Sequence, residues 1–275
     1  MPVSWSPPLW LNHQSRRPGW TSRLLLGLAL AAVLPLLWAP PAAAQTNPCL
    51  SPLNRVVAEN CLPGNPANDP AHPEISWDLG SVDSTAIEGF ATDISVGQNQ
   101  TVHFKIRTVA TKYRIDIYRL GYYGGLGARL IATVPNGATL KQAQSPCLSE
   151  TATGLIDCGN WDESASWAVP ANAVSGVYLA KLVREDGVAG ANHIPFVVRE
   201  ARPSQLLVQT SDTTWQAYNS YGGNSLYVNK PPAPSMSAGR AYKVSYNRPF
   251  VTREGFGQKD YLFTSEYPMI RFLEA

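Results

Sequence analysis

The sequence predicts a mainly β protein, in which an antiparallel β-sandwich of the immunoglobulin or fibronectin III kind is followed by the start of an α/β domain. Short runs in which apolar and polar residues alternate recur from Ile75 to Arg199, and no stretch with helical periodicity interrupts them. After a polar, proline-containing joint at 200–204, a uniformly apolar run indicates a strand of a different kind. These observations place the sandwich at 74–199 and the α/β part at 204–275.

The alternation in the predicted sandwich is clearest in Thr101–Arg107. Val102, Phe104 and Ile106 share one face there, and polar side chains occupy the other. By the same pattern we expect further strands at Tyr113–Leu120, Leu130–Val134, Ser166–Val169, Val177–Arg184 and His193–Arg199. The glycine-rich run at 121–127 is typical of a hairpin turn. A phosphate-binding loop is the alternative, but the run lacks the required lysine and does not precede a helix.

The part after the joint is expected to combine strands with helices. Leu206–Thr210 is short and uniformly apolar, which predicts a strand buried on both faces, and Ala241–Tyr246 is a candidate neighbour. Tyr267–Ala275 is expected to be a helix with an apolar stripe that includes Ile270 and Leu273. About 75 residues follow the joint, whereas α/β domains usually have about 100–150. We therefore expect this domain to be truncated, either because the sequence is a fragment or because the gene is broken.

The first 44 residues have the features of an export signal peptide, and a proline-rich, irregular lead-in is expected at 45–73. Basic residues end at Arg23, an apolar core extends from Leu24 to Trp38, and small residues follow at Ala42–Ala44. We expect cleavage after Ala44, a secreted or periplasmic protein, and no membrane attachment after cleavage. An uncleaved anchor is the alternative, although the apolar core of 15 residues is shorter than the roughly 20 that span a bilayer.

Four cysteines follow the signal peptide: Cys49, Cys61, Cys147 and Cys158. An even number in an exported chain predicts disulfides. Four cysteines permit three pairings; pairing nearest neighbours would close loops with separations of 12 and 11 residues, and the sequence leaves the connectivity open. A zinc site is the alternative, but the close Cys-x-x-Cys spacing that such sites use is absent.

Charge and motifs exclude several classes of function. The formal net charge is +2, and three basic residues lie within the predicted signal peptide, so the rest of the chain is close to neutral. Binding to nucleic acid is therefore not expected. The nucleophile elbow Gly-x-Ser-x-Gly, the zinc motif His-Glu-x-x-His and the phosphate-binding loop are all absent from the sequence.

Tyrosines are concentrated in the last part of the chain, since seven of the 12 follow residue 200. Ordinary packing of half-buried tyrosines would account for this density. Several segments, however, resemble the large (β) subunit of N,N-dimethylformamidase and its relatives. The resemblance is carried by Trp215–Gly223, Lys243–Pro249 and Ser265–Pro268 in the last part, and by Ile115–Gly125 and Ser175–Tyr178 in the predicted sandwich.

The resemblance implies an enzyme that hydrolyses small amides, with a glutamine-amidotransferase-like α/β core and a mononuclear iron bound by two tyrosine phenolates and one glutamate. Phenolate and carboxylate are hard oxygen donors that suit a hard cation. Tyr218 and Tyr246 are the candidate phenolates, with Tyr221 the main rival for the first. Asn219 and Asn247 are candidates for orienting bound water or the amide. A small companion subunit is a further possible partner of such a protein.

The sequence departs from the pattern of these relatives at the third metal ligand. Their glutamate lies in a His-Asp-Glu-Tyr stretch downstream of the second tyrosine, and the 275 residues contain no such stretch. Glu266 is not expected to replace it. We therefore expect these residues to be catalytically incomplete. The alternative is a non-catalytic secreted β-sandwich that binds a glycan or a protein, because sandwich folds carry out both kinds of task.

Overall fold

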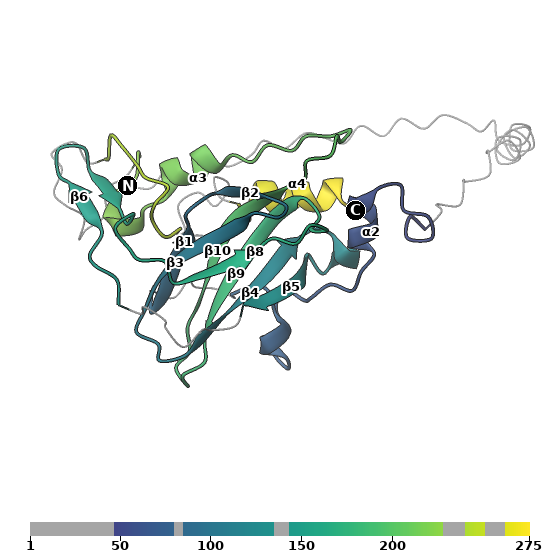
Figure 1. The fold of residues 1–275 in the computed structure, drawn as a ribbon, viewed down its shortest axis with the longest axis horizontal. Helices are drawn as coiled ribbons and strands as arrows, with labels where there is room; N and C mark the ends of the chain where they lie inside the picture. The colour runs from purple at the N-terminus through teal and green to yellow at the C-terminus, as the bar shows by residue number, and fades with distance from the viewer. Residues whose placement is uncertain (1–46, 80–84, 135–142, 228–239, 251–261) are drawn as a thin grey trace, which may run out of the picture. The chain divides into compact units, whose positions relative to one another are not determined.

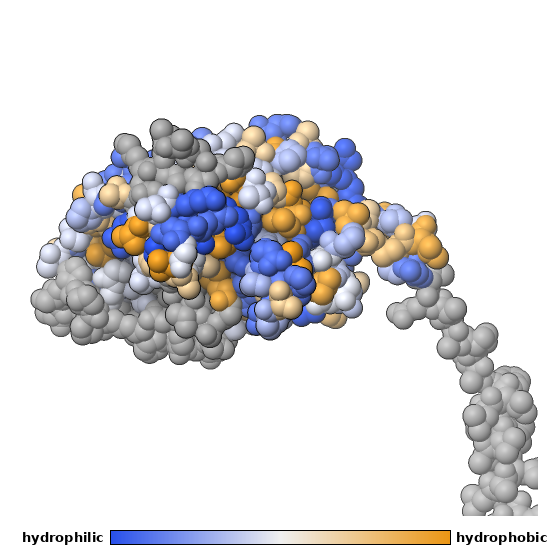
Figure 2. Space-filling model, turned by 90° about the horizontal axis from the view of Figure 1, so that it is seen from below, coloured by the Kyte–Doolittle hydropathy of each residue, from blue (hydrophilic) through white to orange (hydrophobic). Residues whose placement is uncertain are grey.

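The computed structural model describes residues 47–79, 85–134, 143–227, 240–250 and 262–275 (Figure 1). The predicted signal peptide lies outside these ranges. In the described residues the chain is mainly β, with strands concentrated between residues 87 and 199. On the face viewed in Figure 2, polar and apolar residues are interspersed, as is usual for protein surfaces.

Two sheets form the sandwich. The strands are β1 (Ile87–Ala91), β2 (Ser95–Gly97), β3 (Thr101–Thr108), β4 (Tyr113–Leu120), β5 (Ala128–Val134), β8 (Ala165–Ala168), β9 (Gly176–Arg184) and β10 (Ala191–Arg199). One sheet has the order β1-β3-β8, and the other has the order β2-β10-β9-β4-β5. All pairs are antiparallel except β2 with β10, which is parallel. The predicted antiparallel sandwich is thereby confirmed.

The alternation in β3 has the predicted meaning, because Val102, Phe104 and Ile106 are fully buried while their neighbours are partly exposed. Strand β4 is buried at nearly every position. The reason is that the larger sheet is covered on both faces. Its inner face packs against the smaller sheet, and its outer face contacts a second apolar cluster that includes Trp77, Trp215, Phe250, Leu262 and Ile270. Burial on both faces includes two charged residues of this strand, Asp116 and Arg119, each of which forms an ion pair.

A small hairpin interrupts the sandwich between β5 and β8. It consists of β6 (Leu148–Glu150) and β7 (Leu155–Asp157), and the disulfide Cys147–Cys158 closes it. The other disulfide joins Cys49 to Cys61, so the cysteines pair with their nearest neighbours and do not form a zinc site. In the described part of the chain, none of the helices has the length and apolar composition that a membrane crossing requires.

The lead-in is not irregular throughout, because α2 (Arg55–Asn60) forms within it. Asn54 begins this helix, and its side-chain oxygen accepts a hydrogen bond from the Val57 amide at 3.0 Å. The prediction was wrong here because proline and asparagine are frequent around this segment, whereas its own residues are compatible with one helical turn and a half.

After residue 204 the structure departs from the predicted strands. The run Leu206–Thr210 is not a strand: Leu206 is 68% exposed and Leu207 is 95% exposed, since no described strand pairs with this segment. Ala241–Tyr246 is likewise not a strand. Because no strand occurs in the described parts of 204–275, the α/β domain and its limits stay predictions.

The last part of the chain contributes two helices, α3 (Asp212–Tyr218) and α4 (Glu266–Leu273). The predicted C-terminal helix is therefore confirmed. Its apolar stripe is narrower than predicted, because Ile270 is buried against the outer face of the larger sheet while Leu273 is 41% exposed. The two helices and the segment 240–250 thus pack onto the sandwich.

Candidate functional site

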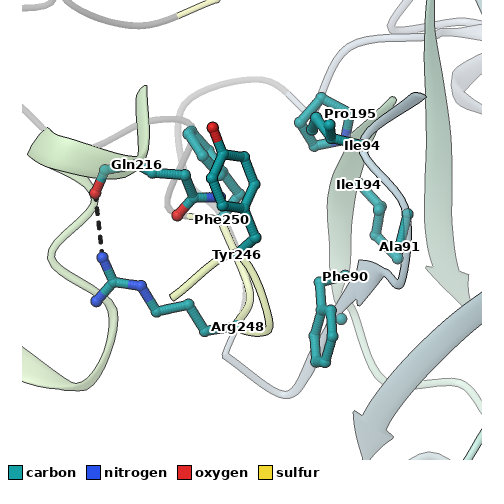
Figure 3. A pocket seen from close by; sticks show the side chains of 10 residues that line it. Phe90, Ala91, Ile94, Ile194, Pro195, Gln216, Tyr246, Arg248 and Phe250 are labelled. Carbon is teal, nitrogen blue, oxygen red and sulfur yellow. Dashed lines mark hydrogen bonds between the residues drawn. The ribbon is translucent and has the colours of Figure 1, made fainter. Parts of the chain in front are cut away.

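A shallow cleft lies between the sandwich and the segment that carries the predicted site residues (Figure 3). Its sandwich side is formed by Gly89, Phe90, Ala91, Ile94, Ile194 and Pro195. The opposite side is formed by Gln216 from α3 and by Tyr246, Arg248 and Phe250. Figure 3 shows the side chains of Gln216, Tyr246 and Phe250 grouped together across the cleft from Ile94 and Pro195.

Tyr246 forms a phenol–carboxylate pair with the first residue of α3. Its hydroxyl donates a hydrogen bond to Asp212 Oδ2 at 2.7 Å. Partial burial of the phenol, together with the hydrogen bond and negative charge of Asp212, raises the pKa of Tyr246 well above its usual range. The phenol is therefore protonated at neutral pH, and any cation that binds its oxygen must displace this proton.

The disulfide-closed hairpin holds the segment that carries Tyr246. The Cys158 amide donates to the Asn247 carbonyl at 2.6 Å, and the Ser245 hydroxyl donates to Asp157 Oδ2 at 2.6 Å. Both contacts immediately flank Tyr246 in the sequence. The position of this tyrosine therefore depends on the hairpin and on its disulfide.

Tyr218 lies at the other end of α3. It is the last residue of the helix, six positions after Asp212, which corresponds to about 9 Å along a helix axis. Its ring is half-buried and stacks on the ring of Tyr227, with 4.2 Å between the centroids. The structure thus brings Tyr246 to the start of α3 and Tyr218 to its end.

Tyr221, the rival candidate, forms a second phenol–carboxylate pair. Its hydroxyl donates to Glu88 Oε1 at 2.8 Å, and Glu88 also forms an ion pair with Arg107. Burial, followed by the charge and hydrogen bond of Glu88, raises the pKa of Tyr221. Glu88 lies on β1, so this tyrosine fastens the loop after α3 to the sandwich.

Asn219 is buried, and its side chain forms hydrogen bonds with main-chain groups. Its Nδ2 donates to the Pro249 carbonyl at 3.0 Å, and its Oδ1 accepts from the Tyr221 amide at 3.3 Å. Asn247 is less buried and lies next to the disulfide-closed hairpin. Of the two predicted asparagines, Asn247 therefore has the more accessible side chain.

Arg248 is the residue of this region whose importance the sequence reasoning missed. Its guanidinium is buried and donates to five main-chain carbonyls: those of Gln216, Asn219, Tyr221, Asn224 and Ser245. Burial lowers the pKa of Arg248 to about 10. The side chain thereby joins the end of α3, the following loop and the segment 245–250. In the sequence, Arg248 is marked only by its place within Lys243–Pro249, one of the segments that resemble the dimethylformamidase relatives.

The donor chemistry of the site fits a hard cation only in part. Tyr246 and Asp212 place two hard oxygens together, which is the ligand type that such cations prefer. Within the described ranges, however, no cluster of three histidine, cysteine, aspartate or glutamate residues could hold a metal ion. Asp212 and Glu88 as partners of the tyrosines could not be found from the sequence, because each pair is far apart along the chain.

The fold and the site together define a β-sandwich protein with a tyrosine-rich C-terminal part packed on its larger sheet. The chain belongs to the family of N,N-dimethylformamidase beta subunit-like proteins: the model of the C-terminal region of this family matches residues 114–275. This match confirms the resemblance to the dimethylformamidase β subunit that the sequence predicts.

The solved structures to which the chain is weakly similar include the following two. Domain 1 of VCBP3 from Branchiostoma floridae is 9% identical, with a TM-score of 0.26, over 44% of this chain and 99% of that one. A marsupial T cell receptor is 14% identical, with a TM-score of 0.25, over 46% of this chain and 61% of that one. These scores are too low to bear on fold or function. A comparison with curated proteins gave no match.

Proposed function

We propose that the protein is an iron-dependent hydrolase of small amides, of which these 275 residues supply the sandwich and two tyrosine ligands but not a complete metal site. The observation that carries the proposal is the family match over residues 114–275. Tyr218 and Tyr246 are the proposed phenolate ligands, and Tyr221 is the alternative to Tyr218. The carboxylate of Asp212 supplies a further oxygen atom beside Tyr246.

In this proposal a bound hard cation would polarise the carbonyl of a small amide. The residues of this chain would hold the cation and shape the cleft in front of it. Asn247 would orient the amide or a water molecule, while Asn219 would act by positioning Pro249 and Tyr221. The absence of the His-Asp-Glu-Tyr stretch from the sequence supports the expectation that these residues bind iron weakly and do not turn over amides.

The test is a titration of the purified protein with ferric iron, followed by visible absorption. We expect a weak phenolate-to-iron charge-transfer band that is lost in Tyr246→Phe and in Tyr218→Phe and retained in the control Tyr242→Phe, which removes an exposed tyrosine. Loss of the band in Tyr221→Phe but not in Tyr218→Phe would show that Tyr221, and not Tyr218, is the second phenolate ligand.

The same samples test the remaining parts of the proposal. Formamide hydrolysis together with a strong band would contradict catalytic incompleteness. The absence of any band would contradict the iron site and favour the alternative of a non-catalytic secreted binding module. Activity is measured as release of formate.

We also propose export to an oxidising compartment, with a signal peptide at 1–44. Two disulfides support this, because such bonds persist where thiols are not kept reduced. Sequencing the N-terminus of the protein recovered from its native host should give Gln45 as the first residue. Recovery of the intact N-terminus from the cytoplasm would contradict export.

A further inference from the structure

The last helix, α4, has apolar side chains on the face that it turns to solvent. Met269 is 53% exposed and Phe272 is 77% exposed, and Leu273 is exposed as well. Residues three and four apart lie on the same face of a helix, so these three side chains are neighbours. A helix at the surface of a protein normally presents charged or polar residues to water. The exposed face of α4 is instead typical of a face that packs against a partner.

The charged residues of α4 and of the residue after it are directed to the protein and not to solvent. Glu266 Oε1 accepts a hydrogen bond from a main-chain amide next to α3 at 3.1 Å, and Arg271 Nη2 donates to the Gly125 carbonyl at 3.0 Å. Glu274 forms the ion pair with the buried Arg119. All three are at least partly buried, so the exposed side chains within 262–275 are uncharged.

A second exposed apolar segment leads to the start of α4. Leu206, Leu207 and Val208 are exposed, and they are followed after two residues by Ser211, whose amide donates to Glu266. Figure 1 shows α3 and α4 on the same side of the sandwich. We call the exposed side chains of the two segments the α4 patch, which consists of Leu206, Leu207, Val208, Met269, Phe272 and Leu273.

The α4 patch is large enough for a stable contact between two proteins. The exposed fractions of its six residues are together equivalent to about four fully exposed side chains, or roughly 600–700 Å² of surface. A standard interface buries about 800 Å² on each partner, so the patch supplies most of the area that is needed. Apolar patches of this size on monomeric proteins often mark a site of interaction.

The absence of charge from the α4 patch favours a second copy of the same chain as its partner. About a two-fold axis a patch contacts itself, so a charged side chain in it would face an identical charge. The uncharged side chains of the α4 patch avoid this repulsion. A membrane surface is a less suitable partner, because helices that lie in membranes carry Lys or Arg on their polar face, whereas Arg271, the basic residue of α4, is bound to Gly125.

We propose that two copies of the chain associate through the α4 patch, with α4 packed against its counterpart about a two-fold axis. The helix has eight residues and is about 12 Å long, so Met269 and Leu273 lie beside Phe272 within one contact. Phe272 is the anchor of this contact, since buried aromatic side chains contribute much of the energy of protein interfaces. The inference goes beyond the proposed function and does not depend on it.

The test is analytical ultracentrifugation of the purified protein at roughly 1–100 μM, the range in which weak contacts of this size dissociate. We expect a dimer. Phe272→Glu should raise its dissociation constant at least about tenfold, because the substitution places two carboxylates in an apolar contact. A mixture of Phe272→Glu and Phe272→Lys should associate more tightly than either variant alone, since opposite charges then meet across the axis.

The matched control is Val109→Glu, which should leave the dissociation constant unchanged. Val109 is as exposed as Phe272, at 77%. It lies before β4, whereas Gly125, which contacts α4, lies after this strand. The eight residues of β4 separate the two positions by about 26 Å, so the control adds the same charge away from the α4 patch.

Three results would overturn the proposal: a monomer at the highest concentration, a dimer that Phe272→Glu does not weaken, or equal weakening by Val109→Glu. A monomer that binds vesicles of phosphatidylcholine and phosphatidylserine, and loses this binding in Phe272→Glu, would assign the α4 patch to a membrane surface instead. Circular dichroism shows whether each variant folds. If Phe272→Glu does not fold, Met269→Lys takes its place, because it introduces a charge on the same exposed face.

Discussion

Arg119 and Glu274 are 155 residues apart in the sequence and form a two-bond ion pair, with Nη1 to Oε2 at 2.8 Å and Nη2 to Oε1 at 2.9 Å. Arg119 lies on β4 and is fully buried, and Glu274 directly follows α4. Asn60 at the end of α2 donates to the same carboxylate at 2.7 Å. The pair therefore fastens α4 and the lead-in helix to the sandwich, and both helices lie together at one end of it in Figure 1.

Replacing Glu274 by alanine is expected to lower the free energy of unfolding by about 3 kcal/mol, because the buried guanidinium would lose its counter-ion. Urea denaturation measures this difference. The matched control is Glu150→Ala, which removes the carboxylate of the exposed pair with Lys243 and should leave the free energy of unfolding nearly unchanged. Equal, small effects of both substitutions would show that the Arg119–Glu274 pair does not stabilise the fold.

The disulfide Cys147–Cys158 is expected to stabilise both the fold and the site. Replacing both cysteines by serine should lower the free energy of unfolding by about 2–3 kcal/mol, since the bond closes a short loop. Because the same hairpin holds the segment around Tyr246, the charge-transfer band with iron should also weaken.

The control for this prediction is the double serine variant at Cys49 and Cys61, which removes a disulfide of similar loop length away from Tyr246. It should lower stability to a similar extent and leave the band unchanged. A weakened band in this control variant alone would contradict the link between the Cys147–Cys158 hairpin and the site.

Asp212→Asn is expected to lower the pKa of Tyr246 toward its ordinary value. The carboxylate accepts the phenol proton and repels the phenolate charge, so both effects that Asp212 exerts favour the protonated phenol. Because burial also raises this pKa, the shift should be partial. An NMR titration of tyrosine labelled at Cζ, carried to strongly alkaline pH, measures the change, and Tyr246→Phe assigns the signal. An unchanged pKa would contradict the Tyr246–Asp212 hydrogen bond.

Arg248→Lys is expected to lower the free energy of unfolding by about 2–3 kcal/mol, although it keeps the charge. A lysine ammonium has three donors and cannot reach five carbonyls in the directions that the guanidinium serves, so buried carbonyls lose their partners. Chemical denaturation gives the magnitude. Arg240→Lys, which alters an exposed arginine, serves as the control and should be neutral.

The strands of the sandwich could be predicted because their information is local. Alternating residues in 101–107 determine which side chains face the core, and the structure buries those side chains. The C-terminal helix was predicted for the same reason. The strand predicted at the apolar run 206–208 was wrong, because a strand requires a neighbouring strand to pair with, and no described strand provides one.

The sequence by itself determined the alternating strands, the even set of cysteines and the tyrosine-rich segment that marks the family. Only the tertiary structure decided that Tyr246 pairs with Asp212, that Tyr221 pairs with Glu88, and that Arg248 binds five main-chain carbonyls. The physical reason is that faces and turns depend on neighbours along the chain. Charge pairs and unsatisfied groups depend on how distant segments pack, which no local pattern encodes.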